Sequence, residues 1–327
     1  MRQKIIIAVS LLLFFLVIYL ITKDFFSNHA KNEENPTEYN LAKLRSIDSS
    51  QFCYKESRHF KLSMKGLNAI VIDSAYRIFI AGENEVQVLD SSLNKLLDFT
   101  TDSTADAIFF SNNKIYLAIQ NHVEIYDMKG KRVQKRNPYL NSSFITSLVA
   151  ENNRLYVADA ANNVVLCYNE DGSLKSIIGK KDSLKGEQGF IIPSMYFDIA
   201  LGQYNDLWIV NPGKHLLMNY NEKGDLRTSW GLASMQLEGF SGCCNPAQLA
   251  ILPDGSFVTY EKGMERIKIY DQTGKYKCVV AGESDFNSKA INNFRLDAMV
   301  NDIATDLNGT VYVVDAVSDV VRMYVKK

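Results

Sequence analysis

The least common local sequence in this chain is a pair of adjacent cysteines, Cys243 and Cys244, followed by Asn245 and Pro246. Neighbouring α-carbons lie ~3.8 Å apart, below the roughly 4.4–6.8 Å that is usual for a disulfide. A bond between these sulfurs would be strained and easily reduced, as suits a redox or ligand-sensing element. A rigid loop with one buried cysteine explains the same residues equally well. Both interpretations stay open.

Zinc binding and nucleophilic catalysis are less favoured at the pair. The sequence has no C-x-x-C, and no histidine lies within ten residues of the pair. The histidines are scattered, so none is assigned as a base for a cysteine nucleophile: they are His29, His59, His122 and His215. Cys53, Cys167 and Cys278 receive no assigned bridge. An odd total of five cysteines leaves at least one thiol free or paired with another molecule.

Three aspartates form a second candidate site. Asp106, Asp198 and Asp302 each stand near the start of a predicted strand, in alternate copies of a repeat. Carboxylate oxygens arranged around an axis can bind a hard cation. The alternative is that they cap strand ends and hydrate a channel, because a metal site normally has a fuller ligand set. A cation at this position is the only cofactor that the sequence suggests.

A repeat of strand-forming residues positions these groups. It occurs six times after Gly66, with an aromatic residue between aliphatic ones and a second landmark, mostly tyrosine, ten to thirteen residues later. The aromatic positions are Phe79, Tyr116, Tyr156, Trp208, Phe257 and Tyr312. Such spacing is typical of propellers and solenoids. Turn sequences such as Asn112-Asn113 and glycines such as Gly274 mark hairpins between the predicted strands.

The sixth repeat stops before its outer strand. Residues 58–64 alternate apolar and polar side chains and are expected to supply the missing strand. The sequence therefore predicts an all-β fold: residues 51–327 form a six-bladed β-propeller closed by an N-terminal strand. The long connections 181–194, 231–246 and 282–299 all fall on one face, at the mouth of the central channel. The cysteine pair is expected near the rim of that face.

The N-terminus predicts a membrane anchor. Arg2 and Lys4 precede an apolar run, Ile5 to Ile21, whose 17 residues would give about 26 Å of helix. We expect a cytoplasmic stretch at 1–4, an uncleaved transmembrane signal anchor at 5–22 and a tether at 23–50. The propeller would then lie on the extracytoplasmic, periplasmic side of the plasma membrane. With 36 basic and 37 acidic residues and no basic stretch, nucleic-acid binding is not expected.

The repeats resemble those of NHL-repeat propellers. The resemblance is clearest from Asn301 to Asp315, and in the fifth repeat, where Cys243-Cys244-Asn245-Pro246 and Glu261-Lys262-Gly263 resemble a bacterial NHL-like group with a paired-cysteine signature. The resemblance implies a six-bladed binding platform, with lyase and lactonase activities in some related propellers. It also implies that Glu261 and Lys262 are neighbours of the cysteine pair, with a solvated ion pair at the rim as the alternative for them.

Three functions follow from these observations. The first is a membrane-tethered, non-catalytic propeller that binds a protein or small molecule through its long-loop face. The second is a metal-dependent lactonase or lyase that uses the channel carboxylates. The third is a redox-linked envelope protein that uses Cys243 and Cys244. The first is favoured because no catalytic constellation is recognised in the sequence.

Overall fold

The computed structural model describes residues 11–20, 22–23, 41–181, 188–204, 206–221, 223–286 and 298–327. Residues 1–41 and 42–327 form two separate units. Most of the N-terminal predictions, for residues 1–10, 21 and 24–40, lie outside the described residues. So do 182–187 and 287–297, in two of the long connections. Residues 11–20 are helical, and among the described residues no helix has the length and apolarity to cross a membrane.

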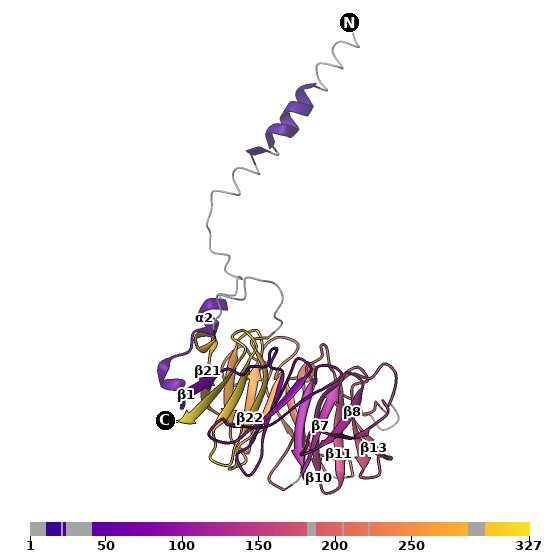
Figure 1. The fold of residues 1–327 in the computed structure, drawn as a ribbon. Helices are drawn as coiled ribbons and strands as arrows, with labels where there is room; N and C mark the ends of the chain where they lie inside the picture. Colours follow the sequence, from indigo (N-terminus) through magenta and orange to yellow (C-terminus); the bar gives the residue numbers. More distant parts are fainter. Residues whose placement is uncertain are drawn as a thin grey trace. The chain divides into compact units, whose positions relative to one another are not determined.

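Six antiparallel sheets of four strands make up the second unit (Figure 1). From inner to outer strand, the first sheet consists of β2 (Ala69–Ile72), β3 (Ile78–Gly82), β4 (Glu85–Leu89) and β5 (Lys95–Thr100). In the same order, the second consists of β6 (Ala107–Ser111), β7 (Lys114–Ile119), β8 (His122–Asp127) and β9 (Arg132–Lys135). The third consists of β10 (Ile145–Glu151), β11 (Arg154–Asp159), β12 (Val164–Asn169) and β13 (Leu174–Ile178). The fourth and fifth sheets are β14 (Ile199–Leu201), β15 (Leu207–Asn211), β16 (Leu216–Tyr220) and β17 (Leu226–Trp230); β18 (Gln248–Ile251), β19 (Phe257–Glu261), β20 (Arg266–Tyr270) and β21 (Tyr276–Ala281). The predicted aromatic positions all lie on the second strand of a sheet.

The sixth sheet takes its outer strand from the other end of the chain. Its order is β22 (Val300–Thr305), β23 (Val311–Asp315), β24 (Val320–Lys326) and then β1 (Tyr54–Phe60). β1 pairs antiparallel with β24, from Tyr54 opposite Lys326 to Phe60 opposite Val321, and Figure 1 shows it beside the C-terminus. The strand expected at 58–64 thus begins four residues earlier. Met64 lies beyond it, buried between sheets.

A disulfide joins the same two regions. Cys53, next to β1, is bonded to Cys278 on β21, with α-carbons 5.8 Å apart across 225 residues of sequence. No bridge was expected between these cysteines, because outer strands of neighbouring blades need not be close. They are close here because Phe52 forms a bridge with Val279 and the Cys53 N–H donates to the carbonyl of Val279 (3.1 Å). The chain before β1 therefore runs along β21.

The hairpin turns predicted at Asn112-Asn113 and Gly274 have the backbone conformations that such turns require. Asn112 and Asn113 have φ of 49° and 56°, the left-handed pair that a two-residue hairpin of type I′ requires. Gly274 has φ 83°, and a Cβ there would lie 2.3 Å from the Trp230 ring. Only glycine meets both conditions without displacing its neighbours. These local turns set the register of the strands on either side.

Apolar side chains pack between the sheets. Each of six buried clusters joins two neighbouring sheets, and one of them combines Ile70 and Ile80 of the first sheet with Tyr312 and Val314 of the sixth. Sheets that pack in this cyclic order form a ring. The predicted six-bladed β-propeller is confirmed for the described residues 42–327, and its core lies between the blades.

Four short helical segments lie outside the β-strands in the described part of residues 41–327. They are α2 (Leu41–Arg45) with the 3₁₀ turn η1 (Ser49–Gln51), η2 (Pro212–Lys214) and η3 (Glu283–Asp285). Arg45 donates to the carbonyl of Gly263 (2.9 Å) and pairs with Glu283 (3.1 Å). The chain entering the propeller is therefore held against the fifth blade and the connection that follows it.

Candidate functional site: the channel mouth and the cysteine loop

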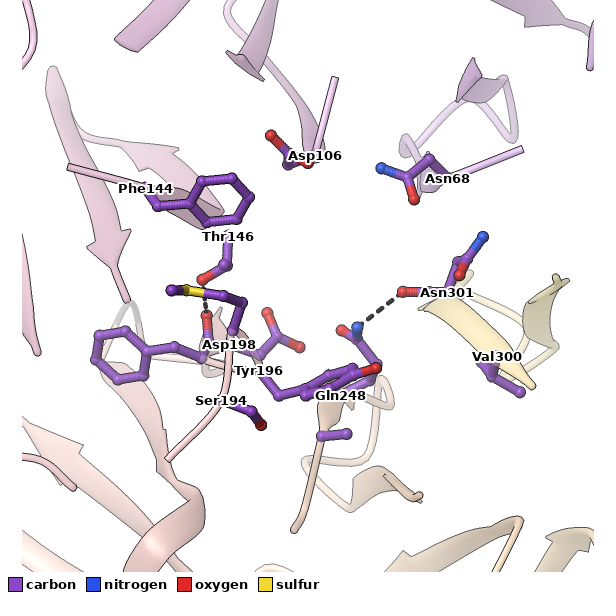
Figure 2. A pocket seen from close by; sticks show the side chains of 13 residues that line it. Asn68, Asp106, Phe144, Thr146, Ser194, Tyr196, Asp198, Gln248, Val300 and Asn301 are labelled. Atoms are coloured by element: carbon purple, nitrogen blue, oxygen red, sulfur yellow. Dashed lines mark hydrogen bonds between the residues drawn. The ribbon is translucent and has the colours of Figure 1, made fainter. Parts of the chain in front are cut away.

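A cavity of about 460 Å³ lies where the six inner strands begin. Every blade contributes to it, and Figure 2 shows the side chains around an open centre. The lining residues are Asn68, Asp106, Phe144, Thr146, Ser194, Met195, Tyr196, Phe197, Asp198, Ala247, Gln248, Val300 and Asn301. Many of them end the long connections that the sequence places on one face. A second cavity of about 250 Å³ between the inner strands shares several of these residues.

The polar residues of the mouth connect neighbouring blades. Thr146 Oγ1 donates to the carbonyl of Phe197 (2.6 Å), and Gln248 Nε2 donates to the carbonyl of Asn301 (2.7 Å). Asn301 Nδ2 in turn donates to the carbonyl of Leu67 in the first blade (2.7 Å). These bonds satisfy backbone carbonyls that the start of each inner strand would otherwise leave unpaired. Much of the polar ring is therefore structural.

Bulges in the inner strands aim two of these side chains. The register of β10 shifts between Ile145 and Ser147, and that of β22 shifts between Val300 and Asp302. In each case the side chain of the residue in between, Thr146 or Asn301, donates a hydrogen bond to a backbone carbonyl near the next inner strand. A bulge inserts one unpaired residue and redirects its side chain. The sequence assigned Asp302 to the mouth, but the structure places Asn301 there and Asp302 in the deeper cavity.

The aspartates mainly accept backbone hydrogen bonds. Asp198 accepts from the N–H groups of Ile199 (2.8 Å) and Leu249 (2.6 Å). Asp302 accepts from the N–H groups of Ile70 and Ile303, both at 2.8 Å. Each carboxylate thus holds its own strand to an adjacent blade. This agrees with the alternative interpretation, in which these aspartates cap the ends of strands.

Asp106 differs from the other two aspartates. Its Oδ2 accepts from the N–H of Gln120 (3.0 Å) within the same blade, and the carboxyl faces the mouth cavity. Among the described residues, no group of three or more cysteine, histidine, aspartate or glutamate side chains could hold a metal ion. The expected cation site therefore gains no support from the geometry of Asp106, Asp198 and Asp302.

Burial makes the channel carboxyls hard to ionise. Desolvation raises the pKa of Asp198 to about 6. Desolvation, together with the nearby charge of Asp198, raises the pKa of Asp302 well above its usual range. Desolvation also raises the pKa of Asp106, against the hydrogen bond from Gln120. The centre of the ring therefore holds less negative charge than the aspartates suggest.

The cysteine pair lies beside this mouth. Cys243 is exposed, Cys244 is buried, and their sulfurs are 3.1 Å apart without a bond between them. Burial, with the proximity of Cys243, raises the pKa of the Cys244 thiol, and the Ser194 hydroxyl acts in the opposite direction. Ser194 also lines the cavity. The thiols and the cavity therefore share a wall.

Asn245 holds the cysteine loop to the fifth blade. Its Nδ2 donates to the carbonyls of Ser241 (2.7 Å) and Lys262 (2.9 Å), and its Oδ1 accepts from the Lys262 N–H (2.8 Å). Lys262 Nζ lies 4.5 Å from the centre of the Tyr196 ring, which lines the cavity. The peptide bond between Asn245 and Pro246 is cis. Asn245 is thus a positioning residue for the thiols, and Lys262 connects them to the cavity wall.

Glu261 does not lie in solvent at the rim. It is fully buried at the end of β19, where Oε1 accepts from the Ser241 N–H (2.7 Å) and Oε2 pairs with Lys268 Nζ (2.9 Å). Lys268 is also fully buried, 4.7 Å from the centre of the Phe240 ring. The alternative of a solvated ion pair is therefore wrong for Glu261. Lys268 compensates the charge of Glu261 inside the blade. The hydrogen bond from the Ser241 N–H to Glu261 fixes the cysteine loop to the buried end of β19.

No histidine was expected near the thiols, yet His215 lies next to the cysteine loop. Its Nε2 is hydrogen-bonded to the carbonyl of Gly242, the residue before Cys243. His215 follows η2 in the fourth blade with a left-handed φ of 56°. The two residues are 27 positions apart in the sequence and lie in different loops, so the contact cannot be predicted from local spacing. Ser194 and Tyr196 were missed for the same reason.

These features define the class of the protein: a six-bladed β-propeller with a polar cavity at its channel mouth and a dithiol loop beside it. No family model matches the sequence, and a search of curated proteins finds no match. Solved propellers resemble it in structure. A streptogramin B lyase gives a TM-score of 0.60 at 13% identity, covering 84% of this chain and 98% of that one.

Two further structures give the same picture. Virginiamycin B lyase from Staphylococcus aureus has a TM-score of 0.59 at 12% identity, over 84% of this chain and 100% of that one. A protein of unknown function from Bacteroides thetaiotaomicron has a TM-score of 0.60 at 12% identity, over 84% of this chain and 76% of that one. At such low identity the likeness shows the fold alone.

Proposed function

We propose that this chain is a membrane-tethered propeller that binds a ligand or a segment of a partner protein at the channel mouth, outside the cytoplasm. The observation that carries the proposal is the 460 Å³ cavity to which all six blades contribute. Pockets of this size, with a few convergent polar groups, are typical ligand sites. The buried carboxylates are already occupied by backbone N–H groups, so binding fits the site better than catalysis does.

The lining favours a particular ligand chemistry. Amides, hydroxyls and the two aspartates Asp106 and Asp198 face the cavity, and Phe144, Met195 and Tyr196 add apolar surface. No lysine or arginine is among the described residues that line it. A neutral or cationic ligand with several hydrogen-bonding groups is therefore favoured over a phosphate or a carboxylate. No bound cofactor is required for this function.

Two observations support an extracytoplasmic site. The Cys53–Cys278 disulfide is a bond that persists in oxidising compartments and is rare in the cytosol. The apolar run from Ile5 to Ile21, preceded by Arg2 and Lys4, has the composition of a signal anchor with a cytoplasmic N-terminus. We propose the plasma membrane as the location, with residues 23–50 as the tether.

A matched pair of variants tests the site. Met195 (54% exposed) lies at the mouth, and Leu307 (58% exposed) lies in the β22–β23 hairpin at the opposite end of the strands. A thermal-shift screen of metabolites and short peptides would supply ligands for the purified chain. We expect Met195→Arg to weaken their binding by at least about tenfold, or 1.4 kcal/mol, and Leu307→Arg to leave it unchanged.

Two results would refute the proposal. One is equal weakening by the two arginine variants, which would mean that the ligands do not bind at the mouth. The other is turnover of lactones or esters by the purified chain in a broad substrate screen. The second result would favour the enzyme alternative, a lyase or lactonase, over a binding platform.

A further inference from the structure

Binding at the cavity leaves Cys243 and Cys244 without a role. The two thiols differ in access, because Cys243 is exposed and Cys244 is buried, and their sulfurs are only 3.1 Å apart. An accessible thiol can attack a disulfide, and a second thiol in contact with it can then resolve the mixed disulfide. Cys167, the other free cysteine, is fully buried in a blade and has no such neighbour.

The loop that carries the pair is held on both sides. His215 is hydrogen-bonded to the Gly242 carbonyl, and the Ser241 N–H donates to buried Glu261 (2.7 Å). On the other side, Asn245 makes three hydrogen bonds to Ser241 and Lys262. The Asn245 side chain and Oε1 of Glu261 hold this short loop in place and keep the two sulfurs together. Such support is more than a buried structural cysteine needs.

We propose that Cys243 and Cys244 are a thiol–disulfide exchange site that converts reversibly between a dithiol and a vicinal disulfide. This function goes beyond ligand binding at the cavity and does not depend on it. The co-reactant is a disulfide, of either a small thiol or a protein with a C-x-x-C site. Exchange would take place at the rim of the cavity, where Ser194, a lining residue, is next to Cys244.

The reaction proceeds in two balanced steps. The Cys243 thiolate attacks one sulfur of the incoming disulfide, forms a mixed disulfide and releases the first thiolate. The Cys244 thiolate then attacks Cys243 Sγ, closes the vicinal bond and releases the second thiolate. The two protons from the cysteines pass to the two leaving thiolates. The pair is oxidised by two electrons, and the incoming disulfide is reduced to two thiols.

The covalent geometry makes this bond a reversible one. Adjacent α-carbons lie ~3.8 Å apart, shorter than the roughly 4.4–6.8 Å of an ordinary bridge. Cys53 and Cys278, at 5.8 Å, fall within the ordinary range. The vicinal bond should therefore be reduced under conditions that leave the Cys53–Cys278 bridge intact. One chain would then hold a permanent disulfide and a cycling one.

Peptide mapping of the full-length chain tests the proposal. The protein is equilibrated at a series of ratios of reduced to oxidised glutathione, quenched in acid, alkylated and cut with trypsin. Both cysteines fall on one tryptic peptide, residues 228–262, which contains no other cysteine. We expect this peptide to lose two hydrogens at oxidising ratios and to regain them at reducing ratios, while Cys167 stays a thiol throughout.

Single substitutions assign the two roles. Cys244→Ser should accumulate a glutathione adduct on Cys243, because no second thiol displaces it. Cys243→Ser should remain unmodified at the buried Cys244. If the wild-type peptide keeps two free thiols at every ratio that preserves the Cys53–Cys278 bridge, the proposal is wrong. A wild-type adduct on Cys243 that never resolves would overturn it as well, and neither result requires a variant to fold.

A second arm separates the possible co-reactants. An oxidised C-x-x-C protein replaces glutathione at the same disulfide concentration. Oxidation of the 228–262 peptide at least about tenfold faster by the protein would support a protein co-reactant, and equal rates would support a small disulfide. Failure of both reagents to oxidise the pair would refute exchange at this site. Ligand binding at the cavity is measured separately, so each proposal can fail alone.

Discussion

Asp198 shows how a residue that resembles a ligand can be part of the scaffold. It is buried at the start of an inner strand and accepts two backbone hydrogen bonds, one from its own blade and one from Leu249 of the next. Desolvation nevertheless outweighs these bonds and raises the pKa of Asp198 to about 6. The Asp198 carboxyl therefore binds its proton more tightly in the folded protein than in the unfolded chain, where the pKa of an aspartate is about 3.9.

The pH dependence of stability follows from this difference. The contribution of Asp198 is fully present below about pH 4 and is lost as the pH rises through about 6. Between about pH 7 and pH 4.5, the free energy of unfolding of the wild type should rise by about 2 kcal/mol relative to Asp198→Asn. Urea unfolding of both proteins at each pH measures the difference. A constant difference across this range would contradict the raised pKa.

Among the elements, β1 joins the two ends of the propeller sequence. It supplies the outer strand of the sixth sheet by pairing with β24, and the disulfide beside it reaches β21 of the fifth. Tyr54 of β1 is buried, and its hydroxyl donates to the carbonyl of Gly309 (3.1 Å). Without β1, the edge of β24 would be exposed and unpaired.

Removal of the bridge should therefore loosen this region first. Cys53→Ser with Cys278→Ser deletes the disulfide without leaving a free thiol, and should lower the free energy of unfolding by about 2–5 kcal/mol. Hydrogen exchange should accelerate in β1 and β24 and stay unchanged in β6 to β9, which serve as the internal control. An unaltered unfolding midpoint, or free thiols at both positions in the native protein, would contradict this expectation.

At the scale of the whole molecule, the propeller is a self-contained unit. Residues 42–327 separate from 1–41, and the apolar clusters all lie between the blades. Folding of the ring should therefore not require the anchor that we propose at 5–22. The anchor would determine only where the ring is located.

Replacement of residues 1–41 by a cleavable signal peptide tests this division. The full chain should sediment with membranes and resist alkaline carbonate extraction, whereas the shortened chain should be soluble in the periplasm. The free energies of unfolding of the two proteins should agree within about 0.5 kcal/mol, because distant and independent parts contribute additively. Recovery of the full chain in the soluble fraction would rule out the tether.

The sequence by itself determined the blades, because five of them, and three of the four strands of the sixth, are each one contiguous stretch of chain. Short apolar runs such as β3 and turn residues such as Asn112-Asn113 and Gly274 act over a few residues, so they can be recognised without tertiary information. The missing outer strand and its source near the N-terminus were readable too, with an error of four residues. The cysteine loop was singled out only because adjacent cysteines are uncommon.

Only the tertiary structure decided which groups meet. It bonded Cys53 to Cys278 across 225 residues and brought His215 to Gly242. A bulge in β22 exchanged Asn301 for Asp302 at the mouth, and burial paired Glu261 with Lys268. These outcomes depend on loop paths, bulges and desolvation, which arise when blades pack together. The periodicity of the sequence does not predict these contacts, because it reflects how neighbouring strands pair within a blade and not how neighbouring blades pack together.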